Sequence, residues 1–392
     1  GGDRAPCHGR GQPHRCRRLV DRACRRGDFA TRQLVAGGPD SNAATPMRSG
    51  FGRQELPYGV FTVPGRIDEP RVGVAVDDDI LDLYAIFRDP VFGQPSLNAF
   101  MAQGREAWTS ARARIRTALE QGVSEYLVPI DQAVLHLPFE VADFADFNSS
   151  KQHATNTGRI LRPGQEPIRQ NWWHLPLGYH GRAGTVVVSG TPVVRPHGQY
   201  LEGDAVVFGP TTCLDVEAEL GFVVGRGSAL GEPIPTADFA DHVFGVVLVL
   251  DWSARDVQAF ETVPLGPFLG KSFATTISAW VYPLEALESA RVPAPAQTPH
   301  VPDYLQVEGS WGFDVRLELS LNGSVISRPR FDSMYWTPPQ QLAHLTVNGA
   351  RVRTGDLYAS GTVSDADEFG SLLELTFDGT RPLTLPDGTM RG

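Results

Sequence analysis

The segment Leu214-Asp-Val-Glu-Ala-Glu-Leu220, continued by Gly-Phe-Val-Val-Gly225, predicts the strand around which the rest of the chain is arranged. Apolar and acidic residues alternate with a period of two, which is typical of a β-strand with one acidic face. That face carries Asp215, Glu217 and Glu219, with successive Cα atoms about 7 Å apart. Facing water, this would be an ordinary amphipathic strand. If the face is enclosed, the like charges need a cation or protonation to relieve their repulsion.

The composition is that of a folded globular protein, because 41% of the 392 residues are hydrophobic and 20% are charged. The net charge of −10 argues against a nucleic-acid partner, and no apolar run reaches the roughly 18 residues of a membrane span. Abundant Gly (41), Pro (31) and Val-rich runs indicate a mainly β, α+β fold with long connections. A lone cysteine in the main body, Cys213, is typical of the cytoplasm.

Three regions are expected. Residues 1–46 are rich in Arg and hold the other three cysteines, so we interpret them as a disordered or leader segment. Strand patterns between residues 56 and 83 and a helical pattern over residues 96–122 predict an N-terminal domain at 51–137, which ends in a Pro-bounded linker and has a supporting role. Residues 138–392 form the larger domain, where the polar clusters lie.

A polar and aromatic stretch opens the larger domain. Asn148 or Ser149 is placed to cap a short helix that Gly158 ends, and this helix carries His153 about one turn from its start. Asp146 precedes the cap, so both Asp146 and His153 are able to approach one pocket. The alternative is that Asp146 is an ordinary partner of the helix cap and that His153 is an ordinary surface histidine.

A second set of candidates follows the apolar run 243–250, which predicts a strand buried on both faces. It leads directly into Asp251, and Arg255 and Gln258 are three residues apart on one face of the following helix. The alternative for Asp251 is the N-cap of that helix. Lys271 follows a loop of Pro and Gly that would hold its ammonium group in a fixed place, unless it is an ordinary surface lysine.

The remaining pattern predicts hairpins at residues 185–194 and around Asn322-Gly323, and a short helix over Thr337–Val347. Glu374 lies in an apolar stretch that we interpret as a strand. There it faces either water or a partner such as a histidine.

Together these segments resemble the fumarylacetoacetase (fumarylacetoacetate hydrolase) family, from about Leu56 to the end of the chain. The resemblance rests on long strings in the order of the family, namely Asp146-Phe-x-Ser-Ser-x-Gln-His-Ala-Thr-Asn-x-Gly, Asn171-Trp-x-His-Leu-Pro-x-Gly-Tyr-His-Gly-Arg, Val187-Val-Ser-Gly-Thr-Pro, Leu214-Asp-x-Glu-x-Glu, Asp251-Trp-Ser-Ala-Arg-Asp, Val263-Pro-Leu-Gly-Pro-Phe-Leu-Gly-Lys-Ser-Phe and Ala359-Ser-Gly-Thr.

The resemblance implies a small SH3-like N-terminal barrel, a larger mixed β-roll catalytic domain and a homodimer. It also implies an enzyme that hydrolyses a carbon-carbon bond of 4-fumarylacetoacetate to give fumarate and acetoacetate, the last step of phenylalanine and tyrosine catabolism. By the same comparison, this chain is expected to end before the family's last strands.

The resemblance also implies a role for each matching residue. The cation ligands would be Asp146, Glu217, Glu219 and Asp251, and an all-oxygen site of this kind suits Ca²⁺ or Mg²⁺. A second, smaller cation would lie near Lys271 and Thr275. The base would be His153, oriented by Glu374, and the groups that stabilise the oxyanion would be Arg255, Gln258 and Lys271. The substrate contacts would be Asn148, Arg162, Tyr179, Gln258, Thr262 and Thr362.

Two of these positions depart from the family, because Asn148 and Thr262 stand where the family has tyrosines that contact substrate. Three other functions stay open at this stage: hydrolysis of another 3,5-diketo acid, decarboxylation or isomerisation of a 2-oxo acid on the same scaffold, and a binding-only homologue without activity.

Overall fold

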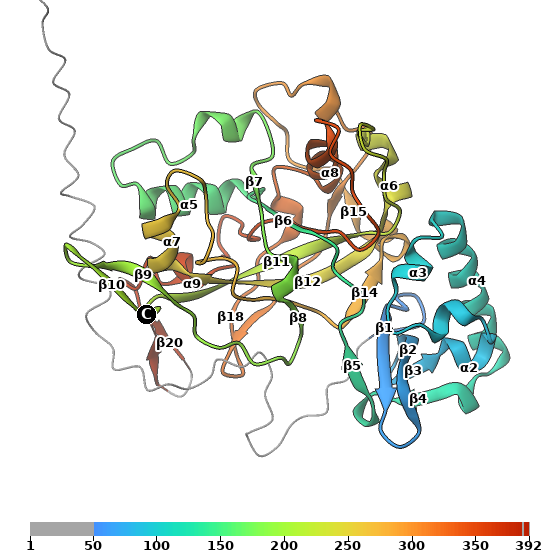
Figure 1. Cartoon of the computed structure of the whole chain (residues 1–392). Coiled ribbons are helices and arrows are strands. Elements are labelled where there is room, and N and C mark those ends of the chain that lie inside the picture. The colour runs from blue at the N-terminus through green and yellow to red at the C-terminus, as the bar shows by residue number, and fades with distance from the viewer. Residues whose placement is uncertain (1–50, 386–387, 392) are drawn as a thin grey trace, which may run out of the picture.

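The computed structural model describes residues 51–385 and 388–391, so the prediction for residues 1–46 lies outside the described part of the chain. Within that part, the largest sheet follows the order β4-β3-β2-β1-β14-β12-β11-β19-β6-β7 (Figure 1). Its strands are β1 (Tyr58–Val63), β2 (Ile67–Val76), β3 (Asp79–Asp82), β4 (Leu127–Pro129), β6 (Phe144–Phe147), β7 (Gly178–His180), β11 (Leu214–Val224), β12 (Val243–Ala254), β14 (Trp280–Pro283) and β19 (Leu357–Ala359).

Side strands extend this sheet. β5 (Val134–His136) pairs with β1, β13 (Thr275–Ile277) pairs with β12, and β8 (Val186–Val188) pairs with β13. The sheet is mixed, because β19 runs parallel to β6 and β8 runs parallel to β13 while β11 and β12 are antiparallel. Short separate ladders are formed by β9 (His197–Glu202) with β10 (Ala205–Pro210), β15 (Arg291–Val292) with β16 (Gly312–Phe313), β17 (Leu319–Leu321) with β18 (Ser324–Ser327), and β20 (Leu383–Thr384) with β21 (Met390–Arg391).

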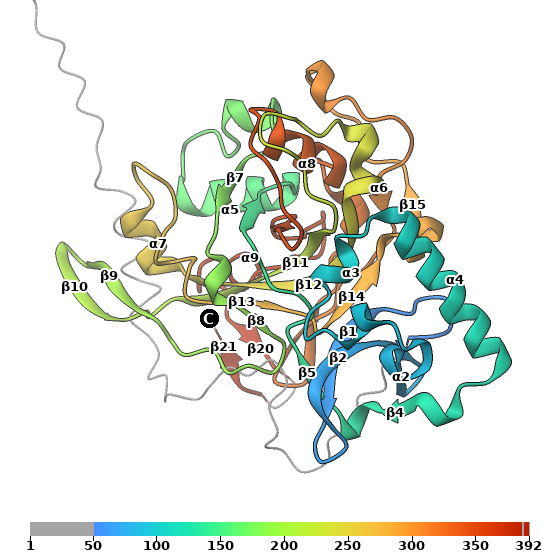
Figure 2. The ribbon, with the colours of Figure 1, turned by 45° about the vertical axis from the view of Figure 1, so that its right-hand side comes forward.

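The helices cover the ends and edges of this sheet (Figures 1 and 2). They are α2 (Leu83–Phe87), α3 (Asn98–Met101), α4 (Arg105–Gln121), α5 (Lys151–Leu161), α6 (Phe239–His242), α7 (Arg255–Glu261), α8 (Pro338–Thr346) and α9 (Leu372–Leu375). No helix among the described residues has the length and apolar character needed to traverse a membrane.

The N-terminal strands and helices follow the sequence pattern closely. The strand patterns between residues 56 and 83 form two antiparallel pairs, β1 with β2 and β2 with β3. The single helix expected over residues 96–122 is instead two helices, α3 and α4, because Gly104 between them has a φ of 85° that breaks the helix. Gly122, the last residue of the predicted helical pattern, is the C-terminal cap of α4.

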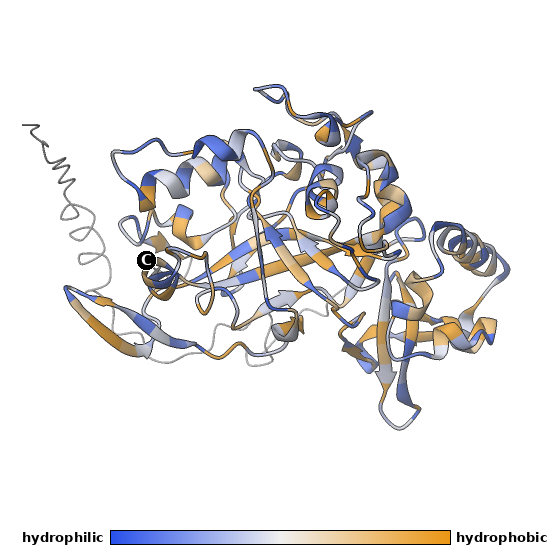
Figure 3. Ribbon diagram, turned by 45° about the horizontal axis from the view of Figure 1, so that its top comes forward, coloured by the Kyte–Doolittle hydropathy of each residue, from blue (hydrophilic) through white to orange (hydrophobic). Residues whose placement is uncertain are grey.

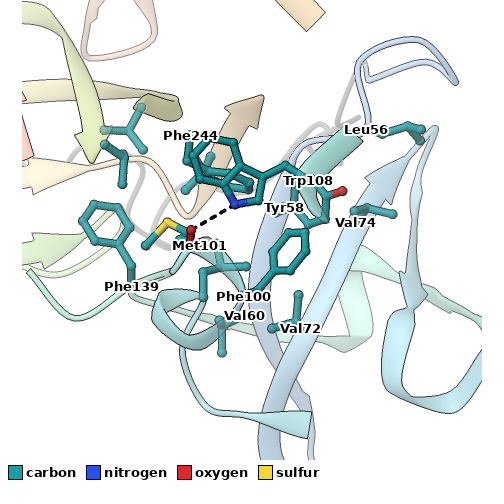
Figure 4. Packing of buried hydrophobic residues seen from close by; sticks show 14 of the residues in the cluster. Leu56, Tyr58, Val60, Val72, Val74, Phe100, Met101, Trp108, Phe139 and Phe244 are labelled. Atoms are coloured by element: carbon teal, nitrogen blue, oxygen red, sulfur yellow. Dashed lines mark hydrogen bonds between the residues drawn. The ribbon is translucent and has the colours of Figure 1, made fainter. Parts of the chain in front are cut away.

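The core of this region is shared with the larger domain (Figure 4). Tyr58 of β1 packs against Phe100 and Phe244 at ring distances of 5.4 Å, and Phe244 belongs to β12. Trp108 of α4 contacts the same Phe244 ring at 5.3 Å and donates a hydrogen bond from Nε1 to the carbonyl of Met101 at 3.0 Å. The backbone joins the two parts as well, since β1 pairs with β14. The SH3-like barrel therefore stays a prediction, whereas the sheet-rich mixed α/β fold is established.

The two long central strands form the middle of the larger domain. β11 and β12 pair antiparallel over nearly their whole length, and both are buried along most of it. Figure 3 shows apolar residues concentrated on the central strands, with hydrophilic residues more frequent on the surrounding helices and loops. This burial excludes the water-facing alternative for the acidic strand face.

The structure confirms two later predictions and contradicts two others. The Asn322-Gly323 turn joins β17 to β18, and Thr337 caps α8 with a reciprocal hydrogen-bonding partner in Gln340. The predicted hairpin at residues 185–194 is wrong, because β8 pairs in parallel with β13 instead of turning back on itself. The predicted strand around Glu374 is also wrong. Ser371 caps the short helix α9 there, and its side chain accepts a hydrogen bond from the Glu374 N–H.

Candidate active site

Four carboxylates meet at the centre of the sheet, and all four residues are buried. They come from three strands: β6 contributes Asp146, β11 contributes Glu217 and Glu219, and β12 contributes Asp251. One ligand oxygen from each lies within 4.8 Å of the others. Figures 1 and 2 place α5, α7 and α9 around the same end of β11 and β12.

Strand register explains this convergence. Glu217 is directly opposite Asp251 in the β11–β12 ladder, and Asp146 reaches them through β19, which pairs with both β6 and β11. Asp251 lies inside β12, and the N-cap of α7 is Ala254, so the alternative that made Asp251 a helix cap is wrong. Arg255 and Gln258 both lie in α7, as the sequence predicted.

The enclosed charges shift one another's pKa values in opposite directions. Burial, followed by the charge of Asp251, raises the pKa of Asp146 to about 7. Burial, followed by the charge of Asp146, raises the pKa of Glu219 well above its usual range. Burial also acts to raise the pKa of Glu217, but the positive charges of Arg255 and Lys271 outweigh burial and lower it strongly. The cluster therefore has an ionised side at Glu217 and an uncompensated side at Asp146 and Glu219.

Two positively charged side chains keep Glu217 ionised. Lys271 is buried and forms ion pairs with Glu217 and, at 2.8 Å, with Asp251. Arg255 donates from Nη2 to Glu217 at 2.6 Å and from Nε to Asp215 at 2.7 Å. Neither side chain makes an ion pair with Asp146 or Glu219 among the described residues.

Hydroxyl groups complete the surroundings of Asp251. The Tyr179 hydroxyl donates to Oδ2 of Asp251 at 2.9 Å, and Thr275 donates to Oδ1 at 3.3 Å. Thr275 and Lys271 therefore both contact Asp251. Tyr179 belongs to β7, which pairs with β6 so that Tyr179 lies opposite Asp146.

The donor set fits a hard divalent cation. In the described part of the chain, Oδ1 of Asp146 and Oε1 of Glu219 are buried without a hydrogen-bond partner. Buried carboxylate oxygens are seldom left unpaired, because desolvation makes this costly. The four residues offer only oxygen ligands, which is the preference of Ca²⁺, Mg²⁺ and Mn²⁺ and not of zinc.

A histidine and a glutamate form a pair beside this cluster. Nδ1 of His153 lies 2.7 Å from Oε2 of Glu374, and Nε2 lies 3.5 Å from Oε1 of Glu217. His153 is buried near the start of α5, whose N-cap is Ser150 instead of the predicted Asn148 or Ser149. Gly158 lies inside α5 and does not end it. A Cβ at this position would come 1.9 Å from the carbonyl oxygen of Pro167, so only glycine allows the loop to pass so close.

Sequence reasoning missed the residues that hold Glu374. Its Oε2 accepts hydrogen bonds from the hydroxyls of Ser364 at 2.9 Å and Ser371 at 2.8 Å, and its Oε1 accepts one from Asn156 at 2.9 Å. Asn156 is three residues beyond His153, on the same face of α5, which is the one signal that the sequence offered.

Asp215 was noted on the acidic strand face but is not a member of the carboxylate cluster. It binds Arg255 and also accepts a hydrogen bond at 2.8 Å from the backbone N–H of Leu372, the first residue of α9. One side chain therefore connects the arginine to the helix that carries Glu374.

The remaining predicted residues differ in whether their side chains already have hydrogen-bond partners. Gln258 accepts a hydrogen bond from Arg255 at 3.0 Å, whereas Thr262, at the end of α7, donates its hydroxyl to the Gln258 carbonyl. Arg162, at the end of α5, donates to the carbonyl of Pro167 at 2.7 Å. By contrast, Oδ1 of Asn148 and Oγ1 of Thr362 are buried with no hydrogen-bond partner among the described residues.

A pocket of about 260 Å³ opens next to the cluster. Tyr179 and Lys271, which both contact Asp251, form part of its wall. The other lining residues are His180, Gly181, Arg182, Ala183, Pro267, Phe268 and Ser272.

A buried carboxylate cluster next to an oriented histidine is typical of a site for acid-base chemistry, and here a sheet-rich α/β fold holds both. The family described as fumarylacetoacetase N-terminal matches residues 54–138, and the family described as fumarylacetoacetate hydrolase C-terminal matches residues 143–386. The chain belongs to the fumarylacetoacetase family of hydrolases.

Individual relatives agree with this membership. Fumarylacetoacetase of Homo sapiens is 46% identical over 374 residues, covering 88% of this chain and 89% of the human protein. Fumarylacetoacetase of Arabidopsis thaliana is 44% identical, covering 86% and 87% respectively. The structure of a fumarylacetoacetate hydrolase from psychrophilic Exiguobacterium antarcticum shares the fold, with a TM-score of 0.50 and 18% identity over 78% of this chain and 86% of that one.

Proposed function

We propose that this enzyme hydrolyses the carbon-carbon bond of 4-fumarylacetoacetate to give fumarate and acetoacetate, the last step of phenylalanine and tyrosine catabolism. The observation that carries the proposal is the His153–Glu374 pair beside four buried carboxylates, in a chain that is 46% identical to human fumarylacetoacetase. A hydrolase of a diketone needs a base for water and a group that accepts charge from the ketone oxygens, and both requirements match this arrangement.

We infer that Asp146, Glu217, Glu219 and Asp251 hold a divalent cation, Ca²⁺ or Mg²⁺, because they offer four carboxylates and two unpaired buried oxygens. When bound, such a cation would draw electron density from the ketone oxygens of a diketo acid and make its carbon-carbon bond easier to break. Lys271 and Thr275 adjoin the same cluster through Asp251, and we propose that a second, smaller cation lies beside them.

The histidine acts as the general base. Glu374 accepts the Nδ1–H of His153, which leaves Nε2 free to take a proton from water. The oxygen of that water then attacks the carbonyl next to the bond that breaks. A base in this position contributes typically about 10² to 10⁴ in rate.

The oxyanion that forms in this attack needs nearby donors, which Arg255, Gln258 and Lys271 provide in this mechanism. When the tetrahedral carbon collapses, the carbon-carbon bond breaks and its electron pair stays with the acetoacetate part. The imidazolium of His153 then gives its proton to the carbon of the acetoacetate part that holds this electron pair, so the base is ready for another cycle.

Substrate binding is assigned to Asn148, Arg162, Tyr179, Gln258, Thr262 and Thr362. Of these, Asn148 and Thr362 are supported best, because each has a buried polar atom without a partner in the described part of the chain. Such atoms recover the cost of their desolvation when a ligand oxygen or hydroxyl binds to them.

We further infer a cytoplasmic homodimer in which an SH3-like N-terminal barrel supports the catalytic domain. Dimerisation is supported by exposed apolar side chains, which are typical of an interface. Phe208 of β10 is 74% exposed and Leu265 in the loop after α7 is 97% exposed. Light scattering coupled to size-exclusion chromatography measures the mass directly, and a mass near 43 kDa, that of one 42.7 kDa chain, would contradict the dimer.

The loss of diketo-acid ultraviolet absorbance tests the reaction. Purified protein is mixed with fumarylacetoacetate in the presence of Ca²⁺ or Mg²⁺, and the assay is repeated after a chelator is added. We expect metal-dependent decay that yields fumarate and acetoacetate in equal amounts. Release of carbon dioxide, or isomerisation without cleavage, would instead place the chain among the decarboxylases and isomerases of the same scaffold.

A further inference from the structure

The pocket beside the carboxylate cluster is lined by a positively charged side chain that has no role in the mechanism above. Arg182 lines this pocket together with Tyr179 and Lys271, and its side chain is exposed. Among the described residues, its guanidinium has no hydrogen bond or ion pair. Arg182 therefore keeps its full set of donors for a ligand.

The backbone around Arg182 is held firmly against the catalytic strands. Gly181 crosses the ring of Phe144 so closely that a Cβ would lie 2.3 Å from it. Three residues after Arg182, the hydroxyl of Thr185 donates a hydrogen bond to the carbonyl of Ser272 at 2.8 Å, which connects this segment to the residue after Lys271. The guanidinium thus projects from a fixed backbone.

The pocket has a positive wall next to a negative cluster. None of its lining residues is acidic, whereas Arg182 and Lys271 are both basic. Pro267 and Phe268 supply an apolar side. At about 260 Å³, the pocket has room for a short carbon chain that ends in a carboxylate.

We propose that Arg182 binds one of the two terminal carboxylates of the substrate and so selects diketo acids that carry a carboxylate at that end. The inference rests on the proposed function and adds a specificity residue to it. A guanidinium binds a carboxylate through two parallel hydrogen bonds, which gives geometric selectivity as well as energy. Arg162 differs in that its guanidinium already donates to the Pro167 carbonyl.

Steady-state kinetics with the Arg182→Gln variant test this proposal. We expect KM for the diketo diacid to rise about 10- to 100-fold, the value of a charged hydrogen bond, while kcat changes by less than about twofold. Arg182→Lys keeps part of the affinity, because lysine retains the positive charge but cannot form the two parallel hydrogen bonds of a guanidinium. Arg66→Gln is the matched control, since Arg66 is an exposed arginine in the β1–β2 turn, and it leaves KM unchanged.

The two monomethyl esters of the substrate show whether the carboxylate is what Arg182 recognises. For the ester blocked at the end that enters this pocket, wild type and Arg182→Gln have the same KM. For the other ester, the full difference remains. An unchanged KM for the diacid, or an equal loss for the diacid and both esters, overturns the proposal.

Calorimetric titration with fumarate and with acetoacetate separates this proposal from the proposed function. Wild-type protein that binds one of these acids more tightly than Arg182→Gln supports the role of Arg182 even if no hydrolysis is seen. Absence of hydrolysis by the folded, metal-loaded wild type counts against the proposed function alone. Equal binding of both acids by the two proteins counts against Arg182.

Discussion

Nδ1 of His153 and Oε2 of Glu374 are 2.7 Å apart, although the two residues are separated by 221 positions in the sequence. His153 comes from α5 and Glu374 from α9, and the side chain of Glu374 is fully buried. The carboxylate orients the imidazole ring and selects the tautomer whose Nε2 accepts a proton.

Replacing Glu374 by Gln changes both the rate and its pH dependence. Burial lowers the pKa of His153, but the charge and hydrogen bond of Glu374 outweigh burial and leave that pKa raised. The base works only when it is neutral, so activity falls as the pH drops through the pKa of His153. Removing the charge therefore moves the acid limb of kcat to lower pH, while kcat on the plateau falls by about 10²- to 10⁴-fold.

A pH-rate profile measured with saturating substrate checks this prediction. Glu308→Gln serves as the control, since Glu308 is an exposed glutamate. An acid limb that stays in place in the Glu374 variant would show that Glu374 does not act on the histidine.

Metal-free protein loses stability as the pH rises from about 4 to about 7. In the folded protein the pKa of Asp146 is raised from 3.8 to about 7, so in this window the folded state holds a proton that the unfolded state has released. The contribution of Asp146 is complete below pH 3.8 and is lost as the pH passes through 7. Glu219 acts in the same direction.

Thermal melts in chelator over this pH range measure the effect. A divalent cation competes with these protons, so its stabilisation is largest above pH 7 and its binding releases protons below that pH. The Asp146→Asn variant removes the titrating group and flattens the profile. A wild-type melting temperature that rises between pH 5 and 7 in chelator would contradict the prediction.

Lys271→Met destabilises the metal-free protein by about 3 to 5 kcal/mol, because it removes a buried cation and leaves Glu217 and Asp251 with less compensation. Urea unfolding in chelator measures the loss. The matched control is Arg105→Met, which breaks an exposed ion pair with Asp241 and costs less than about 1 kcal/mol. Similar losses of stability for the two variants would mean that the buried ion pairs of Lys271 contribute no more to stability than an exposed ion pair does.

Gly158→Ala lowers stability by about 1 to 3 kcal/mol, although alanine is the better helix former. The added Cβ would collide with the Pro167 carbonyl and displace α5, which also carries His153. A reduced kcat accompanies the lower melting temperature. Gly184→Ala is the control, because nothing lies within 4 Å of a Cβ there, and a stabilised Gly158 variant would disprove the close contact.

Local features followed from the sequence because they depend on neighbouring residues. The alternation from Leu214 to Leu220 predicted β11, and the apolar spacing of Leu342 and Leu345 predicted α8. The strings shared with the fumarylacetoacetase family contain Asp146 and His153, and the resemblance as a whole implied a role for Glu374. The mistakes also had local causes, since the apolar stretch around Glu374 has the composition of a strand but is capped as a helix by Ser371.

The sequence by itself determined which residues carry charge and which strand faces are acidic or apolar. Only the tertiary structure decided that this acidic face is enclosed, because burial depends on strands far apart in the chain that meet through the register of β6, β19, β11 and β12. The same long-range packing pairs Lys271 with Glu217, whereas the guanidinium of Arg182 has no hydrogen bond or ion pair among the residues that the structure describes. Burial makes the repulsion between the ionised carboxylates stronger, and a bound cation would relieve it. For this reason the enclosed acidic face is a candidate metal site.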